Sequence, residues 1–368
     1  MKKRVVSMLL IGCLGAALLV GCGNEKTDAN AGGDTNASVG TEAKADTSGK
    51  DFGEYSADHP LELKLSHFAA SEENQLAILA NTFADYVSQE SGGAVKVTVY
   101  GGGTLGNDQE SLDSVIAGTL DCAVNNTPIM SGYDAGLSVL DLPYLFENYD
   151  DIYTFLDSDV CQEMLDDFSS TGAKILNLQC VGFRNLESSK GFVEKPSDLK
   201  GLKVRVTGSD VYINTWNTWG ASAQTMPGNE VLTALQQGTI DGVSGTTLTN
   251  MYGGKFYEQC DYITMTKHHF IPAPVVMNED LWNSLSSEDQ EIVQKAFNDS
   301  ISYQREQAAS YVEKAVAEIE DSGTEIVEID ADEWADAMHS TYDKWVGTKG
   351  IEQDMIDKIQ ESEKQYLK

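Results

Sequence analysis

Two arginines of this sequence lie in surroundings that suit the recognition of an anion. Only four of the 25 Lys and Arg residues are Arg, namely Arg4, Arg184, Arg205 and Arg305. Arg184 lies within Val-Gly-Phe-Arg-Asn and Arg205 within Lys-Val-Arg-Val, two apolar segments typical of strands. A guanidinium binds a carboxylate through two hydrogen bonds, and a buried one needs an anionic partner. These two arginines therefore indicate either a site for an organic anion or internal salt bridges with some of the 58 acidic residues.

The sequence contains no arrangement of residues typical of catalysis. None of its five histidines belongs to an H-E-x-x-H motif. His268 and His269 are adjacent, and neighbouring residues of a strand point to opposite faces, so we expect no shared metal ion. Gly101–Gly106 fits the G-x-G-x-x-G pattern of dinucleotide sites, but it follows the second predicted strand rather than the first. We interpret it as a glycine-rich turn, and we expect no cofactor and no enzymatic activity.

The N-terminal residues are typical of an exported protein. The cationic segment Lys2–Arg4 precedes an apolar stretch, Val5–Val20, which is short for a membrane span. The segment Leu19–Cys22 resembles the lipobox of bacterial lipoproteins, which implies that Cys22 becomes a lipidated N-terminus. An uncleaved anchor and an ordinary signal peptide are the alternatives. The residues that follow contain few large apolar side chains and predict a flexible tether.

The composition describes a folded and strongly acidic body. Its formal net charge of −33 argues against nucleic acid and against an anionic lipid surface as partners. A hydrophobic fraction of 41% is ordinary for a folded chain, so the acidity does not indicate disorder. Four cysteines of the body lack the short spacing of metal ligands. The sequence is compatible with disulfides and with buried free thiols for these residues, which are Cys122, Cys161, Cys180 and Cys260.

Beyond Pro60 the chain alternates segments with the periodicities of strands and helices, which predicts an α/β fold. Apolar and polar residues alternate in Leu61–Leu65, and apolar residues recur at helical spacing between Asn74 and Glu90. Further strands are predicted at 95–100, 120–124, 174–178, 204–206 and 326–329. Further helices are predicted at 108–116, 150–168, 230–237 and 286–320.

Eight short motifs follow one another between Leu61 and Asn278. They are Gln89–Gly93, Gly103–Asp108, Gly118–Asp121, Leu142–Phe146, Gly182–Arg184, Asp198–Val206, Ala234–Gly242 and Lys255–Glu258. Taken in this order they resemble the extracytoplasmic solute-binding proteins of TRAP transporters, the DctP-like family. The resemblance implies a two-lobed periplasmic-binding-protein-like α/β fold, with mixed sheets flanked by helices and a long C-terminal helix that bridges the lobes. It also implies capture of a small organic acid, such as a sugar acid or a dicarboxylate.

The resemblance further implies which residues bind this ligand. Arg205 matches the family's arginine that forms a salt bridge with the ligand carboxylate, and Arg184 matches a second arginine that assists it. Hydroxyls or other polar groups of the ligand would contact Asp108, Asn126, and His67 or Phe68.

One position departs from the family pattern. Gly245 stands where many members have an asparagine that helps to hold the carboxylate. Ser244, Thr246 or a water molecule would then take the place of that asparagine. The departure leaves the arginine anchor in place but changes what the site selects.

The expected organisation follows from these features. It comprises a lipoprotein signal peptide at 1–21, a lipidated Cys22 and tether at 22–58, lobe I at 59–181 plus about 270–310, and lobe II at 182–269 plus about 311–368. The partners implied are a small carboxylate, the permease subunits of the transporter, and the lipid bilayer through Cys22, on the extracytoplasmic face. A binding protein of an ATP-driven importer, a chemosensory ligand carrier and a secreted hydrolase are the alternatives.

Overall fold

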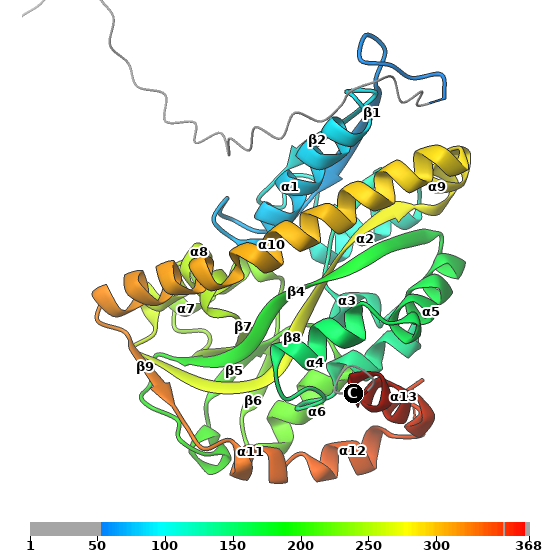
Figure 1. Cartoon of the computed structure of the whole chain (residues 1–368). Coiled ribbons are helices and arrows are strands. Elements are labelled where there is room, and N and C mark those ends of the chain that lie inside the picture. Colours follow the sequence, from blue (N-terminus) through cyan, green and yellow to red (C-terminus); the bar gives the residue numbers. More distant parts are fainter. Residues whose placement is uncertain (1–52, 349, 365–368) are drawn as a thin grey trace, which may run out of the picture. The chain divides into compact units, whose positions relative to one another are not determined.

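The computed structural model describes residues 53–348 and 350–364 (Figure 1). The signal peptide, Cys22 and the tether as far as residue 52 lie outside these residues. The strands are β1 (Leu61–Ser66), β2 (Val95–Tyr100), β3 (Cys122–Val124), β4 (Ala173–Ser188), β5 (Lys203–Val206), β6 (Ser222–Thr225), β7 (Gly242–Thr246), β8 (Tyr262–Asn278) and β9 (Glu325–Glu328).

Helices connect and cover these strands. They are α1 (Gln75–Glu90), α2 (Asp108–Ile116), α3 (Thr127–Met130), α4 (Tyr149–Leu156), α5 (Asp159–Asp167), α6 (Asp210–Thr218), α7 (Val231–Gln236), α8 (Leu248–Gly254), α9 (Glu279–Ser284), α10 (Ser287–Asp321), α11 (Asp332–Asp336), α12 (His339–Trp345) and α13 (Gln353–Lys364). Within the described ranges, no helix combines the length and the apolar character that crossing a bilayer requires.

The nine strands form one mixed sheet in the order β2-β1-β3-β8-β4-β7-β5-β6, with β9 paired to β8. Near one end β1 pairs in parallel with β2 and β3, and near the other β5 pairs in parallel with β6 and β7. The long strands β4 and β8 run antiparallel to each other and join the two parallel groups (Figure 1). This arrangement confirms the predicted α/β fold. We expected separate sheets in the two lobes, whereas β4 and β8 connect all the strands into one continuous sheet.

Both long strands are irregular in the middle. The pairing of β4 with β8 changes register between Cys180 and Phe183 and again between Arg184 and Leu186. Gly182 on β4 and Lys267 on β8 have φ angles of 133° and 47°. A bulged strand bends and re-aims its side chains. The strand predicted at 174–178 covers only the first part of β4, which itself has a register shift between Ile175 and Leu178.

Hydrophobic side chains form separate clusters on the two parallel groups. Helices α1 and α10 cover β1 and β2, and the rings of Phe83 and Phe297 meet edge to face with centroids 5.6 Å apart. The other parallel group packs on α6 through Val204 and Trp216. Further along α10, Ile319 belongs to a cluster with residues of α8 and β8. The long helix therefore contacts both parts of the sheet, as predicted (Figure 1).

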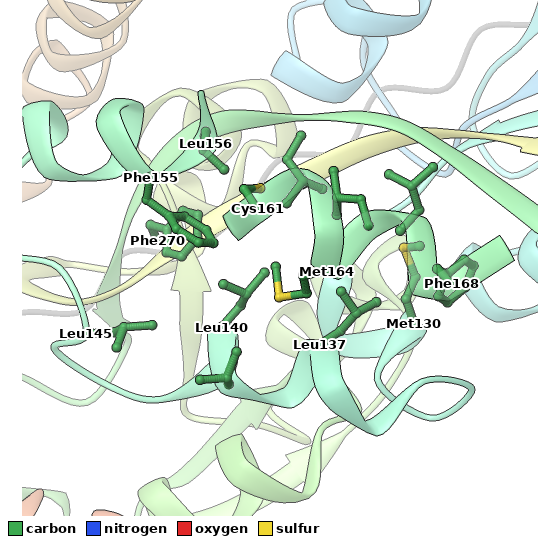
Figure 2. Packing of buried hydrophobic residues seen from close by; sticks show 14 of the residues in the cluster. Met130, Leu137, Leu140, Leu145, Phe155, Leu156, Cys161, Met164, Phe168 and Phe270 are labelled. Atoms are coloured by element: carbon green, nitrogen blue, oxygen red, sulfur yellow. The ribbon is translucent and has the colours of Figure 1, made fainter. Parts of the chain in front are cut away.

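A fourth cluster lies between β4, β8 and helices α2 to α5, and Figure 2 shows its packed side chains. Ile356 and Ile359 of α13 join this cluster, so the C-terminal helix packs on α4 and α5. We expected the C-terminal residues to belong to lobe II, whereas α4 and α5 lie in the range expected for lobe I. The lobe boundaries remain a prediction.

The single helix that we predicted at 150–168 is wrong, because two helices occupy this range. Helix α4 ends at Leu156, and α5 begins at Asp159. The Oγ atom of Ser158 accepts a hydrogen bond from the Cys161 N–H at 3.2 Å. Serine is among the preferred residues at a helix N-cap, so Ser158 starts a second helix where periodicity alone indicates continuation.

Candidate functional site

A cavity of about 200 Å³ lies beside residues that follow the parallel strands of both groups. Phe68 follows β1, Asn126 follows β3, Thr207 follows β5, and Thr246 ends β7. Ligands of open α/β sheets bind beyond the carboxyl ends of the strands, where loops from different strands converge. The topology therefore places this cavity where a binding site is expected.

The cavity brings together most of the residues that the sequence singled out. It is lined by Arg205, Arg184, Asp108, Asn126, Phe68 and Gly245. His67 and Ser244 are not among its lining residues. The ring of His67 lies against Gly101, and the Ser244 hydroxyl lies 3.4 Å from Nε2 of the buried His268. Both residues are buried, and each is next in sequence to a residue that lines the cavity.

Arg205 is held by neutral oxygen atoms, with 6% of its surface exposed. Its Nε and Nη2 donate to the carbonyl oxygen of Met226 at 3.1 and 2.8 Å, and its Nη1 donates to Oγ1 of Thr207 at 3.3 Å. A guanidinium has five N–H donors. The described residues thus leave one N–H on Nη1 and one on Nη2 without a partner. This pair has the spacing that a carboxylate accepts bidentately.

Arg184 approaches the same point from β4 and is 3% exposed. Its Nη1 donates to the carbonyl oxygen of Gly245 at 2.6 Å and lies 3.5 Å from Oγ1 of Thr207. The ring of Tyr212 lies beneath the guanidinium, with its centroid 5.0 Å from Cζ. Thr207 therefore contacts both arginines, and the two positive charges converge on one end of the cavity.

Neither cation of the cavity has an internal carboxylate partner. No ion pair within 4.0 Å among the described residues includes Arg184 or Arg205, whereas Arg305 pairs with Asp157 at 2.8 Å. Burial lowers the pKa of Arg205 to about 10, an effect that the nearby Asp108 opposes, so Arg205 remains charged at neutral pH. Within residues 53–348 and 350–364, neither arginine therefore forms the internal salt bridge that we considered from the sequence. Both positive charges are available to a bound anion.

Two acidic side chains near Arg205 do not neutralise it fully. Burial raises the pKa of Asp108, although Arg205 acts in the opposite direction. Glu187 on β4 is fully buried, and burial raises its pKa well above the usual range. Neither Glu187 oxygen has a hydrogen-bond partner among the described residues. A buried carboxyl group without such partners favours its neutral form, so Glu187 leaves the charge of Arg205 in place.

Gly245 is required where the chain departs from the family pattern. It has a φ of 106°, and a Cβ at this position would lie 2.3 Å from Nη1 of Arg184. The missing side chain lets the guanidinium lie directly against the backbone of β7. The asparagine that many family members carry here would displace Arg184 from its present position.

Several residues that line the cavity were not predicted from the sequence. Thr207 stands two residues after Arg205, so strand alternation puts both on one face and would have identified it. Asn74, Asn229 and Asn250 come from loops and helices far apart in the sequence. The sequence contains no signal that brings these three together.

The prediction that His268 and His269 point to opposite faces is wrong. Their ring centroids lie only 4.9 Å apart, so the two rings contact each other. No cluster of three potential metal ligands occurs among the described residues. The four body cysteines are buried free thiols, and Trp216 and Trp219 are core residues that pack on Trp334.

Gly245→Ala should destabilise the protein more than a matched glycine substitution. Gly220 has a φ of 105° with no atom within 4 Å of an added Cβ, so Gly220→Ala measures the backbone strain alone. We expect Gly245→Ala to cost about 1–3 kcal/mol more in urea unfolding, because it also displaces Arg184. Equal losses for the two variants would show that Arg184 is not held in the described position.

Asp141, behind Arg184, should make stability depend on pH. It is fully buried, its Oδ2 accepts from the Ser209 hydroxyl at 2.7 Å, and burial raises its pKa to about 7. The folded chain keeps this proton after the unfolded chain has lost it, so the free energy of unfolding decreases as pH rises from about 4 to about 7. Urea unfolding at pH 5 and pH 8 should show a smaller decrease for Asp141→Asn than for the unchanged protein. Asp167→Asn, at an exposed acid, is the control, and an equal decrease in both variants would contradict this assignment.

Residues 65–348 match the family of bacterial extracellular solute-binding proteins, family 7 (DctP). The chain is 30% identical to an uncharacterised protein of Haemophilus influenzae over 73% of its own length and 81% of that protein. It is similar to the sugar acid binding protein DctPAm of Advenella mimigardefordensis, which was solved in complex with galactonate. The TM-score is 0.77 and the sequence identity is 26%, and the similarity covers 83% of this chain and 98% of DctPAm.

A second solved structure has a different ligand. It is a TRAP periplasmic solute binding protein of Sulfurospirillum deleyianum with bound succinate, similar with a TM-score of 0.75 and 29% identity over 81% of this chain and 98% of that one. The family match spans most of the described residues and includes all the cavity residues that the sequence predicted. The chain belongs to the bacterial extracellular solute-binding proteins of family 7, the DctP family.

Proposed function

We propose that this protein is the solute-binding receptor of a TRAP-type secondary transporter and captures a small organic acid outside the membrane. The observation that carries the proposal is the pair of buried guanidinium groups, Arg184 and Arg205, which line one cavity and form no ion pair within 4.0 Å among the described residues. A buried charge without a partner is costly in free energy, so such a pair is suited to an anionic ligand. The related proteins solved with galactonate and succinate support a carboxylate as this anion.

Closure around the ligand would come from movement of the two parallel groups of strands. The cavity walls come from both groups, and the register shift between Cys180 and Phe183 lies where the expected lobe I ends. Across the cavity mouth, the backbone N–H of Gln75 donates to Oδ1 of Asn250 at 3.3 Å. Lys314 of α10 contacts Glu73 at 2.7 Å. Opening would break these contacts and bend β4 and β8 at their irregular centres.

The proposed location is the extracytoplasmic face of the membrane, with the permease subunits of the transporter as protein partners. A lipid on Cys22 would retain the protein there, because acyl chains together bind a bilayer durably. This anchor is inferred from Leu19–Cys22 and from the cationic and apolar residues before it. Energy for transport would be supplied through the permease, since no nucleotide is needed by the receptor.

Arg205→Gln should weaken ligand binding severely. Thermal shift with a panel of sugar acids and short-chain acids identifies the best ligand, and calorimetry then measures its affinity. We expect a loss of about 30-fold or more, equivalent to about 2 kcal/mol, because the carboxylate loses a buried charged partner. Arg305→Gln, which removes a surface arginine paired with Asp157, should bind normally. Unchanged affinity in Arg205→Gln, or no ligand among the acids, would contradict the proposed function.

Cys22→Ser should release the protein from the membrane. In cells producing the full chain, the unchanged protein should fractionate with membranes and yield an acylated N-terminal peptide beginning at Cys22 by mass spectrometry. The serine variant has no thiol to modify and should enter the soluble fraction. Membrane retention of both proteins would indicate an uncleaved anchor, and soluble behaviour of both would indicate an ordinary signal peptide.

A further inference from the structure

We propose that the site selects a monocarboxylate whose remainder is uncharged and hydroxylated, and that it rejects dicarboxylates. This inference rests on the proposed function, because it concerns the same cavity. It distinguishes between two ligand classes, since one related structure holds galactonate and another holds succinate. The distinction follows from where the charges of the cavity lie.

Both cations of the cavity lie at one end. Nη1 of Arg184 and Nη1 of Arg205 lie 3.5 and 3.3 Å from the same atom, Oγ1 of Thr207. The two N–H groups that remain on Arg205 can hold one carboxylate. Because Arg184 converges on the same point, it strengthens binding of that carboxylate rather than providing a second anchor elsewhere.

The other walls of the cavity have no positive charge. No Lys or His belongs to its lining residues, and the only other ionisable side chain there is the carboxyl group of Asp108. Lys255 is adjacent to the lining residues Gly254 and Phe256, but its side chain is 65% exposed and lies 3.9 Å from Glu258. A second carboxylate would therefore be buried without a cation, and in the same cavity as Asp108.

The chemistry of these walls suits an uncharged body. The amide groups of Asn126, Asn229 and Asn250 can donate to and accept from hydroxyl groups, and the carboxyl group of Asp108 can accept from them. Leu232 and Phe256 provide apolar surface for the carbon chain. Removing a carboxylate from water without a partner costs several kcal/mol, whereas a hydroxyl group in this environment keeps its hydrogen bonds.

Two matched ligand pairs test the inference by calorimetry on the full-length mature protein at neutral pH. Succinamate and succinate differ by one amide in place of a carboxylate, and galactonate and galactarate differ by one hydroxymethyl group in place of a carboxylate. We expect the monocarboxylate of each pair to bind at least about 10-fold more tightly, and galactonate to bind more tightly than succinamate. Equal or tighter binding of either dicarboxylate, with Arg205→Gln still abolishing binding, would overturn the inference and leave the proposed function intact. Binding of none of the four acids would overturn both.

A gain-of-function variant provides a second test, because a misfolded protein could lose binding but would not gain a preference for dicarboxylates. Leu232 is half-buried and lines the cavity, so Leu232→Lys supplies a cation among lining residues that have none besides the two arginines. We expect this variant to shift the affinity ratio toward succinate by about 10-fold or more. Gln236→Lys adds the same charge at an exposed position of α7 that does not line the cavity, and it should leave the ratio unchanged. An unchanged ratio in Leu232→Lys, in protein that unfolds cooperatively, would contradict the inference that missing positive charge excludes dicarboxylates.

Discussion

The proposed function depends on keeping two guanidinium groups buried without an ion pair to a carboxylate among the described residues. The carbonyl oxygens of Met226 and Gly245 and the hydroxyl of Thr207 accept their hydrogen bonds, so neutral atoms orient the cations without neutralising them. A hydrogen bond to a charged donor contributes about 1.5–3 kcal/mol, which offsets part of the cost of burial. The remainder is available as binding free energy for an anion.

This constraint explains two local features of the fold, the bulges of β4 and the glycine at position 245. The bulges of β4 re-aim Arg184 into the cavity, and Gly245 leaves room for it beside β7. The same irregular segments separate the two hydrophobic clusters built on α1 and α6, so they are suited to bend when the cleft opens. The formal net charge of the chain, −33, is therefore compatible with binding an anion, because the proposed recognition depends on two buried cations.

Sequence periodicity was sufficient for the regular elements, such as β2 and α2, whose observed bounds match those predicted. It failed where local capping or bulges decide the structure. Ser158 caps a second helix where one was predicted, and the rings of His268 and His269 contact each other where strand alternation would separate them. For the site, rare arginines in apolar strands and the family resemblance predicted two arginines that line the cavity. The asparagines at 74, 229 and 250 were not predicted, because only the tertiary fold brings these distant positions together.

The most direct measurement is a crystal structure of the protein purified without refolding and then saturated with its best-binding acid. We expect a ligand carboxylate within about 3 Å of Nη1 and Nη2 of Arg205, with Met226 and Thr207 still hydrogen-bonded to the guanidinium. The rest of the ligand should face Asp108, Asn229 and Asn250. A carboxylate bound elsewhere, or an internal salt bridge from Asp108 or Glu187 occupying Arg205 in the presence of ligand, would contradict this expectation.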